Sequence, residues 1–168
     1  MINRERLCEE FARQAAIASP SRREGEISRY LTRRFQELGG TVTMDGAGAA
    51  AGSESGNLIV QFPARGKESA PLMLSVHMDT VEPAEGVMPI LADGIFTSVG
   101  ETILGADDKA GIAEIIEALE VIRERNIPHG PLEVVVTICE EIGLVGAKLL
   151  DYSLVRSRRA LALDTSGV

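Results

Sequence analysis

The sequence predicts an α/β domain in which a mixed, largely parallel sheet is flanked by helices. Runs rich in β-branched residues alternate along the chain with segments whose apolar residues recur at helical spacing. Acidic residues and one histidine follow several of these runs, as ligands do at the carboxyl edge of a parallel sheet. The 168 residues suffice for one domain with a substantial core.

Two helices are predicted near the start of the chain. Asn3 is the expected N-cap of the first, whose apolar residues recur every four positions until the helix ends before Pro20. Residues 21–24 (Ser-Arg-Arg-Glu) have the form of a capping box and are expected to start the second. Its apolar stripe, which should pack on the sheet, ends at the glycine pair 39–40 and consists of Ile27, Tyr30, Leu31, Phe35 and Leu38.

The next part of the chain is predicted to form strands and a hairpin. The expected strands are residues 41–44, 57–62 and 72–77. Residues 45–56 are rich in glycine and alanine, with little to fix their conformation, so we expect a mobile loop. Within residues 88–98, apolar residues flank Asp93-Gly94, a pair that suits the positive φ angles of a type I′ hairpin turn.

The remaining elements alternate between helix and strand. Asp108 is the expected N-cap of a long helix that continues to about Asn126. The segment 132–138 is strongly β-branched and should form a strand. A short helix within 144–151 and a last strand at 160–163 are expected to follow.

Composition excludes several classes of partner. The net charge of −8 argues against nucleic acid, because phosphate binding relies on clustered Lys and Arg. No apolar run approaches the ~20 residues of a membrane helix, so we expect no membrane contact. The two cysteines, Cys8 and Cys139, lie far apart and the N-terminus lacks an apolar signal segment. We therefore expect reduced thiols and a cytoplasmic location.

His77 and Asp79 are the first pair with metal-site chemistry. They stand two residues apart at the end of a predicted strand, so their side chains should point the same way. An imidazole can bind a metal through one nitrogen and donate its other N–H to a carboxylate such as Asp79. The alternative is a core histidine beside a surface acid, which is the stronger interpretation for this pair alone.

Two further acidic pairs allow a similar choice. Asp107 and Asp108 are adjacent carboxylates, which repel each other unless a divalent cation lies between them. The alternative is that both are acids at the start of a helix, where the helix dipole stabilises them. Glu140 and Glu141 follow a predicted strand. They form either a solvated acidic loop or a pair in which a general base stands next to a metal ligand. Cys139 should face the other side of that strand as a small buried hydrophobe.

The order of these motifs carries a family resemblance over essentially the whole chain. His-Met-Asp-Thr (77–80) is followed by Gly-Ala-Asp-Asp-Lys-Ala-Gly (105–111), Glu-Glu-Ile-Gly-Leu-Val-Gly-Ala (140–147) and Leu-Asp (163–164). This series resembles the dinuclear zinc exopeptidases, which include peptidase T, aminoacylase, glutamate carboxypeptidase and succinyl-diaminopimelate desuccinylase. Within that family the chain looks most similar to peptidase T and peptidase T-like proteins, which implies a zinc-exopeptidase-like (phosphorylase/hydrolase-like) fold.

The resemblance also implies a site with two divalent cations, most simply Zn²⁺, with Co²⁺ or Mn²⁺ as alternatives. His77 and Asp164 would bind one cation, Glu141 would bind the other, and Asp107 would bridge the two.

The same resemblance assigns the catalytic roles. Asp79 would orient His77, and Glu140 would be the general base that moves a proton from the attacking water to the leaving amine. The peptide bond between Asp107 and Asp108 would be cis.

Two parts of the family pattern are not found in these 168 residues: a histidine for the second zinc, and a lid domain inserted after the segment ending near Asp164. The other histidine, His129, follows a predicted helix in a turn and is interpreted as a surface residue. We therefore expect residues 1–168 to be the N-terminal part of a catalytic metallopeptidase domain, incomplete at the C-terminus. We expect it to be inactive alone and to self-associate through exposed apolar surface.

Three functions remain open at this point. The leading hypothesis is a zinc aminopeptidase that acts on short peptides, in the manner of a tripeptidase. The second is an amidohydrolase or carboxypeptidase for N-acyl amino acids, with the same metal site and a different lid. The third is a non-catalytic α/β module that binds a divalent ion or a partner. Binding of two zinc ions would favour a hydrolase-derived site over the third hypothesis.

Overall fold

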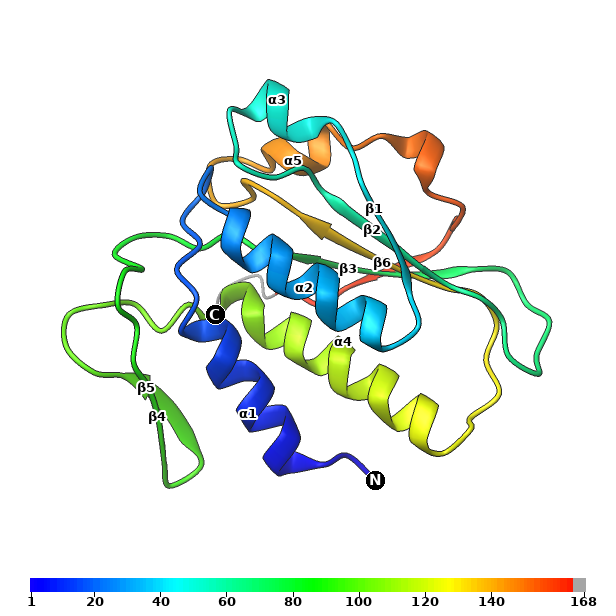
Figure 1. Cartoon of the computed structure of the whole chain (residues 1–168), viewed down its shortest axis with the longest axis horizontal. Helices are drawn as coiled ribbons and strands as arrows, with labels where there is room; N and C mark the ends of the chain where they lie inside the picture. The colour runs from blue at the N-terminus through cyan, green and yellow to red at the C-terminus, as the bar shows by residue number, and fades with distance from the viewer. Residues whose placement is uncertain (165–168) are drawn as a thin grey trace.

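The computed structural model describes residues 1–164, in which helices and one main sheet alternate along the chain (Figure 1). The helices are α1 (Arg4–Ala15), α2 (Gly25–Glu37), α3 (Ala47–Ala51), α4 (Ala106–Glu124), α5 (Val145–Lys148) and the 3₁₀ turn η1 (Tyr152–Leu154). The strands are β1 (Thr41–Met44), β2 (Leu58–Phe62), β3 (Leu72–His77), β4 (Pro89–Ala92), β5 (Ile95–Ser98), β6 (Leu132–Thr137) and β7 (Ala160–Ala162). None of the described helices combines the length and apolar character that crossing a membrane requires.

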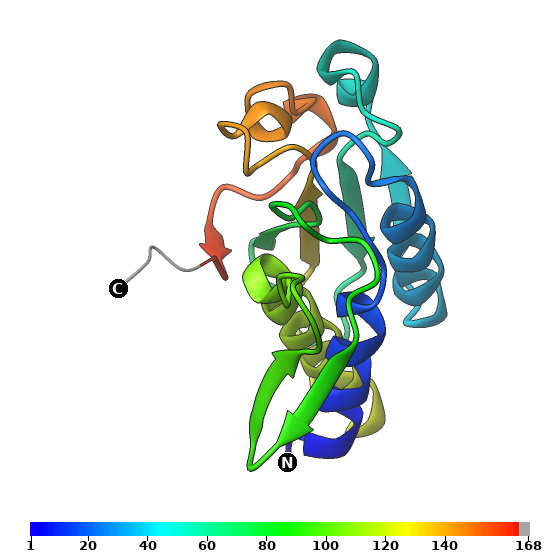
Figure 2. The ribbon, with the colours of Figure 1, turned by 90° about the vertical axis from the view of Figure 1, so that its left-hand side faces the viewer.

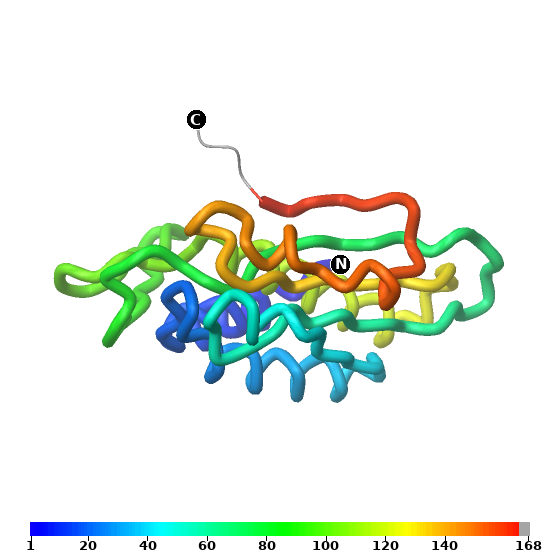
Figure 3. The backbone as a smooth tube through the Cα atoms, turned by 90° about the horizontal axis from the view of Figure 1, so that it is seen from above, coloured from blue at the N-terminus to red at the C-terminus, as the bar shows by residue number. Residues whose placement is uncertain are grey.

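The main sheet is mixed, with strand order β1-β2-β6-β3-β7. The pairs β1/β2 and β2/β6 are antiparallel, whereas β3/β6 and β3/β7 are parallel. Figure 3 shows β7, in red, at one edge beside β3. The predicted α/β class and mixed sheet are confirmed, although the sheet is less parallel than the sequence suggested.

The predicted hairpin forms a separate two-stranded sheet of β4 and β5. Its turn residues Asp93 and Gly94 have φ angles of 51° and 82°. Positive values at both positions are the requirement of a type I′ turn, so this prediction is confirmed.

The core lies between α2, α4 and one face of the main sheet. Alternate residues of β2 and β6 point into it, among them Leu58, Val60 and Val134, all fully buried. Helix α2 contributes its predicted apolar stripe, with Leu31 and Phe35 at 0% exposure. Burial of each such side chain stabilises the fold by about 1.5–3 kcal/mol.

The segment after α5 covers part of the opposite face. Gln61 Nε2 donates to the Leu154 carbonyl at 3.2 Å, and the Glu133 carboxylate accepts the backbone N–H groups of Arg156 and Ser157. Figure 2 shows α2 and the α5 segment on opposite sides of the sheet.

Two local predictions were wrong. Residues 45–56 are not a mobile loop, because they contain α3, in which Ala47, Gly48 and Ala51 are buried. Residues 21–24 do not form a capping box, because the Glu24 side chain at the N-cap of α2 makes no capping bond. Ser21 donates its hydroxyl to Asp79 instead. Asn3, by contrast, caps α1 as predicted by accepting the Arg6 N–H.

Candidate metal centre

The candidate site lies at the carboxyl ends of the two parallel central strands. His77 is the last residue of β3 and pairs in register with Thr137, the last residue of β6. Glu140 and Glu141 follow β6 closely, and Asp164 follows β7, which runs parallel to β3. Parallel strands place their carboxyl ends at the same edge, and the predicted ligands therefore meet there.

Two overlapping groups of side chains at this edge have the spacing of metal ligands. His77 groups with Glu140 and Glu141, and also with Asp107 and Asp164, with the ligand atoms of each group within 4.8 Å of one another. His77 Nε2 lies 3.0 Å from Asp107 Oδ1 and 3.9 Å from Glu140 Oε2. The structure thus brings together all four predicted metal ligands and the predicted base.

The imidazole of His77 is held from its other side. Its Nδ1 lies 2.9 Å from the backbone carbonyl oxygen of Asp79 and 3.5 Å from carboxylate oxygen Oδ1 of the same residue. With Nδ1 protonated, the ring donates to that carbonyl, and Nε2 faces Asp107. Burial alone would lower the pKa of His77, but contacts with Asp79, Asp107 and Asp108 outweigh it and raise the pKa to about 9.

The carboxylate of Asp79 has a second contact set that sequence reasoning missed. This fully buried group accepts the backbone N–H groups of Glu140 at 2.8 Å and Glu141 at 3.2 Å, and the Ser21 hydroxyl at 2.6 Å. Burial would raise the pKa of Asp79, but His77 and these hydrogen bonds lower it overall. Asp79 therefore holds both the histidine and the acidic loop. No local pattern signals this, because the donors lie about sixty residues away on either side.

The Asp107–Asp108 segment interrupts the regular start of α4. Gly105 is the N-cap, the Asp107–Asp108 peptide bond is cis as the resemblance implied, and both aspartates have non-helical backbone angles. Asp108, the predicted N-cap, lies at this kink, directly before the regular part of the helix. Its buried carboxylate accepts the His77 backbone N–H at 3.3 Å, and burial with nearby Asp164 and Asp107 raises its pKa to about 7.

The charge and donor types of the site suit a divalent cation. Burial, and then neighbouring carboxylates, raise the pKa values of Glu140 and Glu141. A bound cation would relieve this repulsion, and an imidazole nitrogen with several carboxylate oxygens is a donor set used for zinc. Cys139 is fully buried, and its thiol donates to Glu24 Oε1 at 3.2 Å. Its pKa is raised to about 12 by burial and by Glu24, in keeping with its predicted structural role.

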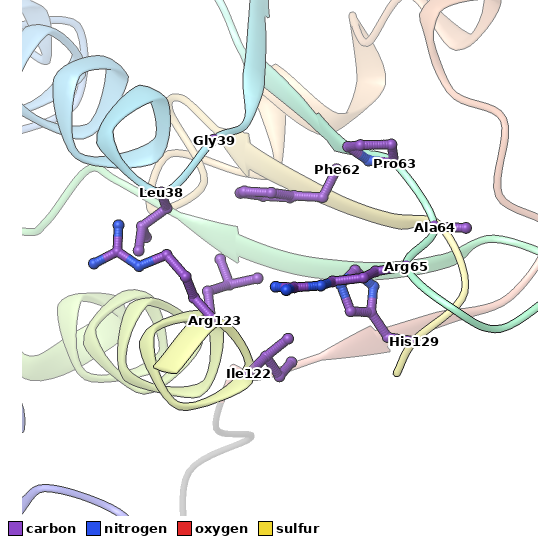
Figure 4. A pocket seen from close by; sticks show the side chains of 10 residues that line it. Leu38, Gly39, Phe62, Pro63, Ala64, Arg65, Ile122, Arg123 and His129 are labelled. Carbon is purple, nitrogen blue, oxygen red and sulfur yellow. The ribbon is translucent and has the colours of Figure 1, made fainter. Parts of the chain in front are cut away.

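His129 lies elsewhere, in a pocket of about 260 Å³ near the amino ends of β3 and β6 (Figure 4). The pocket has an apolar floor that includes Phe62 and Ile122, with Arg65 and Arg123 beside it. These guanidinium groups already have partners, because Arg65 donates to Asn126 and Arg123 to Glu120. His129 belongs to neither ligand group among the described residues.

The sequence is similar to an aminopeptidase family and to peptidase T. The M42 glutamyl aminopeptidase family matches residues 87–168. The uncharacterized protein YqjE of Bacillus subtilis is 42% identical over 167 residues, which are 99% of this chain and 45% of that protein. Peptidase T of Escherichia coli is 48% identical over 79 residues, which are 47% of this chain and 19% of that protein.

Solved structures of an aminopeptidase and a tripeptidase are also similar to this chain. The aminopeptidase PepT of Bacillus cereus has a TM-score of 0.96 and 44% identity, over 99% of this chain and 44% of that one. A tripeptidase of Staphylococcus aureus has a TM-score of 0.95 and 42% identity, over 99% of this chain and 45% of that one. The chain therefore spans less than half the length of these relatives.

Proposed function

Because this chain belongs to the peptidase T-like metallopeptidases, we propose that its acidic sheet edge is part of an active site that hydrolyses short peptides, as a tripeptidase-like aminopeptidase does. The observation that carries the proposal is the meeting of His77 with four carboxylates in two groups of closely spaced ligand atoms. Two similar solved structures are those of an aminopeptidase and a tripeptidase, which supports the choice of substrate.

The proposed site holds two divalent cations, with zinc as the first choice and cobalt or manganese as alternatives. His77 and Asp164 would hold one cation, Glu141 would hold the other, and Asp107 would supply a carboxylate to both. The two groups of ligand atoms support the separation of Asp164 from Glu141, because Asp164 lies in the group of His77 and Asp107, and Glu141 lies in the group of His77 and Glu140. The lid domain and the further histidine that the resemblance implies stay predictions, as does the cytoplasmic location.

The proposed chemistry is general-base hydrolysis of a peptide bond. Divalent cations, when bound, lower the pKa of water from 15.7 towards ~7 and polarise a carbonyl group. Glu140 takes a proton from the attacking water and returns it to the leaving amine. Burial and neighbouring carboxylates raise the pKa of Glu140, which makes it a stronger base than an ordinary carboxylate. Asp79 positions this base through the Glu140 N–H and orients His77.

Zinc titration by calorimetry tests the site directly. We expect the wild-type chain to bind zinc, and we expect Asp107→Ala and Glu141→Ala to weaken binding at least tenfold, because each removes a charged ligand. Glu101→Ala is the matched control, since it removes an exposed carboxylate that lies outside both ligand groups. Failure of the wild-type chain to bind zinc, or an equal loss in Glu101→Ala, would overturn the proposal.

A further inference from the structure

The segment between α1 and α2 runs beside the candidate centre. Thr80 donates its backbone N–H to the Ser19 carbonyl at 3.0 Å, and the Ser19 hydroxyl donates to the Met78 carbonyl at 2.9 Å. These contacts, with a parallel bridge between Pro20 and Thr80, hold the start of the segment against the stretch that carries Asp79. Two side chains of the segment then point towards the acidic loop.

The first of these is Ser21, whose hydroxyl lies 2.6 Å from Asp79 Oδ2. The Asp79 carboxylate accepts both the Glu140 and the Glu141 backbone N–H groups, so it is the link between Ser21 and the loop. A carboxylate that is fully buried needs donors on each oxygen, and Ser21 supplies one of them.

The second is Glu24, which is also fully buried. Its Oε1 accepts the Cys139 backbone N–H at 3.0 Å and the Cys139 thiol at 3.2 Å, and its Oε2 accepts the Ser53 hydroxyl at 2.5 Å. Cys139 has a φ of 51°, a conformation that few residues other than glycine adopt. Glu24 therefore holds the turn at which β6 gives way to the acidic loop.

Three successive backbone N–H groups, those of residues 139, 140 and 141, thus bind two buried carboxylates. We infer that Ser21 and Glu24 are positioning residues that hold the Glu140–Glu141 loop so that both its carboxylates face His77. The inference rests on the proposed function, because it says that these residues position the side chains of the proposed metal site. Residues 21–24, which the sequence predicts to be a capping box, therefore have a different role. Ser21 and Glu24 bind Asp79 and Cys139, which are distant in the sequence, instead of capping α2.

The test uses the whole chain and cobalt(II), whose visible absorption reports the number and geometry of its ligands. We expect Ser21→Ala and Glu24→Ala to weaken cobalt binding about 10–100-fold and to alter the spectrum, as loss of outer hydrogen bonds does at metal sites. Ser21→Thr keeps the hydroxyl and Glu24→Gln keeps one acceptor oxygen, so both should restore much of the binding.

Glu10→Ala is the matched control for loss of a buried carboxylate. Glu10 is 3% exposed and binds Tyr30 and Arg34 in the helical layer, away from the ligand groups. This variant should lose stability in urea and keep the wild-type cobalt spectrum. Wild-type affinity and spectrum in both Ser21→Ala and Glu24→Ala would overturn the inference and leave the proposed function standing.

Amide hydrogen exchange tests the positioning role of Ser21 and Glu24 separately from the proposed function, because it needs no bound metal. Faster exchange at the Glu140 and Glu141 amides in Ser21→Ala and Glu24→Ala, with unchanged exchange in β2, supports the inference. Wild-type exchange at both amides in both variants overturns it. Absence of cobalt binding by the wild-type chain counts against the proposed function alone.

Discussion

At the scale of single residues, carboxylate side chains that accept several backbone N–H groups control how the chain turns. Asp45 shows this in residues 45–56, for which the sequence predicts a mobile loop. Its Oδ1 accepts the backbone N–H groups of Ala47 and Asn57, and its Oδ2 accepts from the Asn57 side chain and from the Asp151 N–H. One carboxylate thus joins the start of α3, the start of β2 and the segment after α5, which explains why residues 45–56 are ordered.

Two glycines in this segment provide a test of that order. A Cβ at Gly48 would lie 2.3 Å from the Ser55 carbonyl oxygen, whereas a Cβ at Gly46 would meet nothing within 4 Å. We expect Gly48→Ala to destabilise the fold by about 1–3 kcal/mol, because backbone must move. Gly46→Ala has a compatible φ of −86° and should be neutral or stabilise by up to about 1 kcal/mol. Urea unfolding followed by circular dichroism measures both; equal, small effects would mean that the segment is mobile after all.

At the scale of elements, the Glu133 carboxylate of β6 attaches the segment after η1 to the sheet. Glu133 is 2% exposed and lies 2.6 Å from the Ser157 N–H. Burial would raise its pKa, but hydrogen bonds from Ser157, Arg156 and Gln61 outweigh it and hold the pKa below the ordinary 4.5. A lowered folded pKa means that the stabilisation is complete above about 4.5 and is lost as pH falls through the folded value.

Glu133→Gln should therefore show a pH-dependent cost. At pH 7 we expect a loss of about 1–3 kcal/mol, the contribution of hydrogen bonds to a charged group. The difference from wild type should shrink as the pH falls below about 4.5 and through the lowered folded pKa, because the wild-type carboxylate then becomes protonated. Urea unfolding at several pH values gives the comparison, with the exposed Glu68→Gln as control. A difference that is the same at pH 3 and pH 7 would contradict this account.

The elements that sequence reasoning predicted are those whose stabilising pattern is local. The β-branched run of β6 and the apolar strands β2 and β3 were predicted to within a residue, because alternation and turn residues are visible in a short window. Helix α3 was missed because its five residues are too few for a periodic signal. The motif at 21–24 was misread because its true partners, Asp79 and Cys139, lie 58 and 115 residues from Ser21 and Glu24.

The candidate site also has features that the sequence predicted and features that it could not indicate. The ligand set came from the order of the short motifs and from the family resemblance that this order carries, because each motif alone also allowed a structural interpretation. The reason that the ligands meet is the parallel pairing of β3 with β6 and β7, which brings three strand ends to one edge. What the sequence could not indicate is the support behind them, since the double role of Asp79 depends on the packing of three separate segments.

At the scale of the whole molecule, the sheet has one weakly covered edge. Among residues 1–164, β7 pairs only with β3, and all three of its residues are exposed. Its free side offers unpaired backbone groups, and Leu161 beside them is 56% exposed. An exposed edge strand with an apolar side chain is a template for pairing with another chain. The predicted self-association therefore has a definite location on the structure.

We expect the wild-type chain to form dimers or larger species at high concentration, and Leu161→Lys to shift it towards monomer, because a lysine on an edge strand opposes strand pairing. Sedimentation equilibrium over a range of concentrations measures the shift. Ile2→Lys is the matched control, since it makes the same kind of change at a residue that is 55% exposed and lies outside every strand. If Ile2→Lys dissociates the species as strongly as Leu161→Lys does, general apolar exposure or net charge is responsible instead of the β7 edge. A wild-type chain that remains monomeric at every concentration would show that this edge does not drive association.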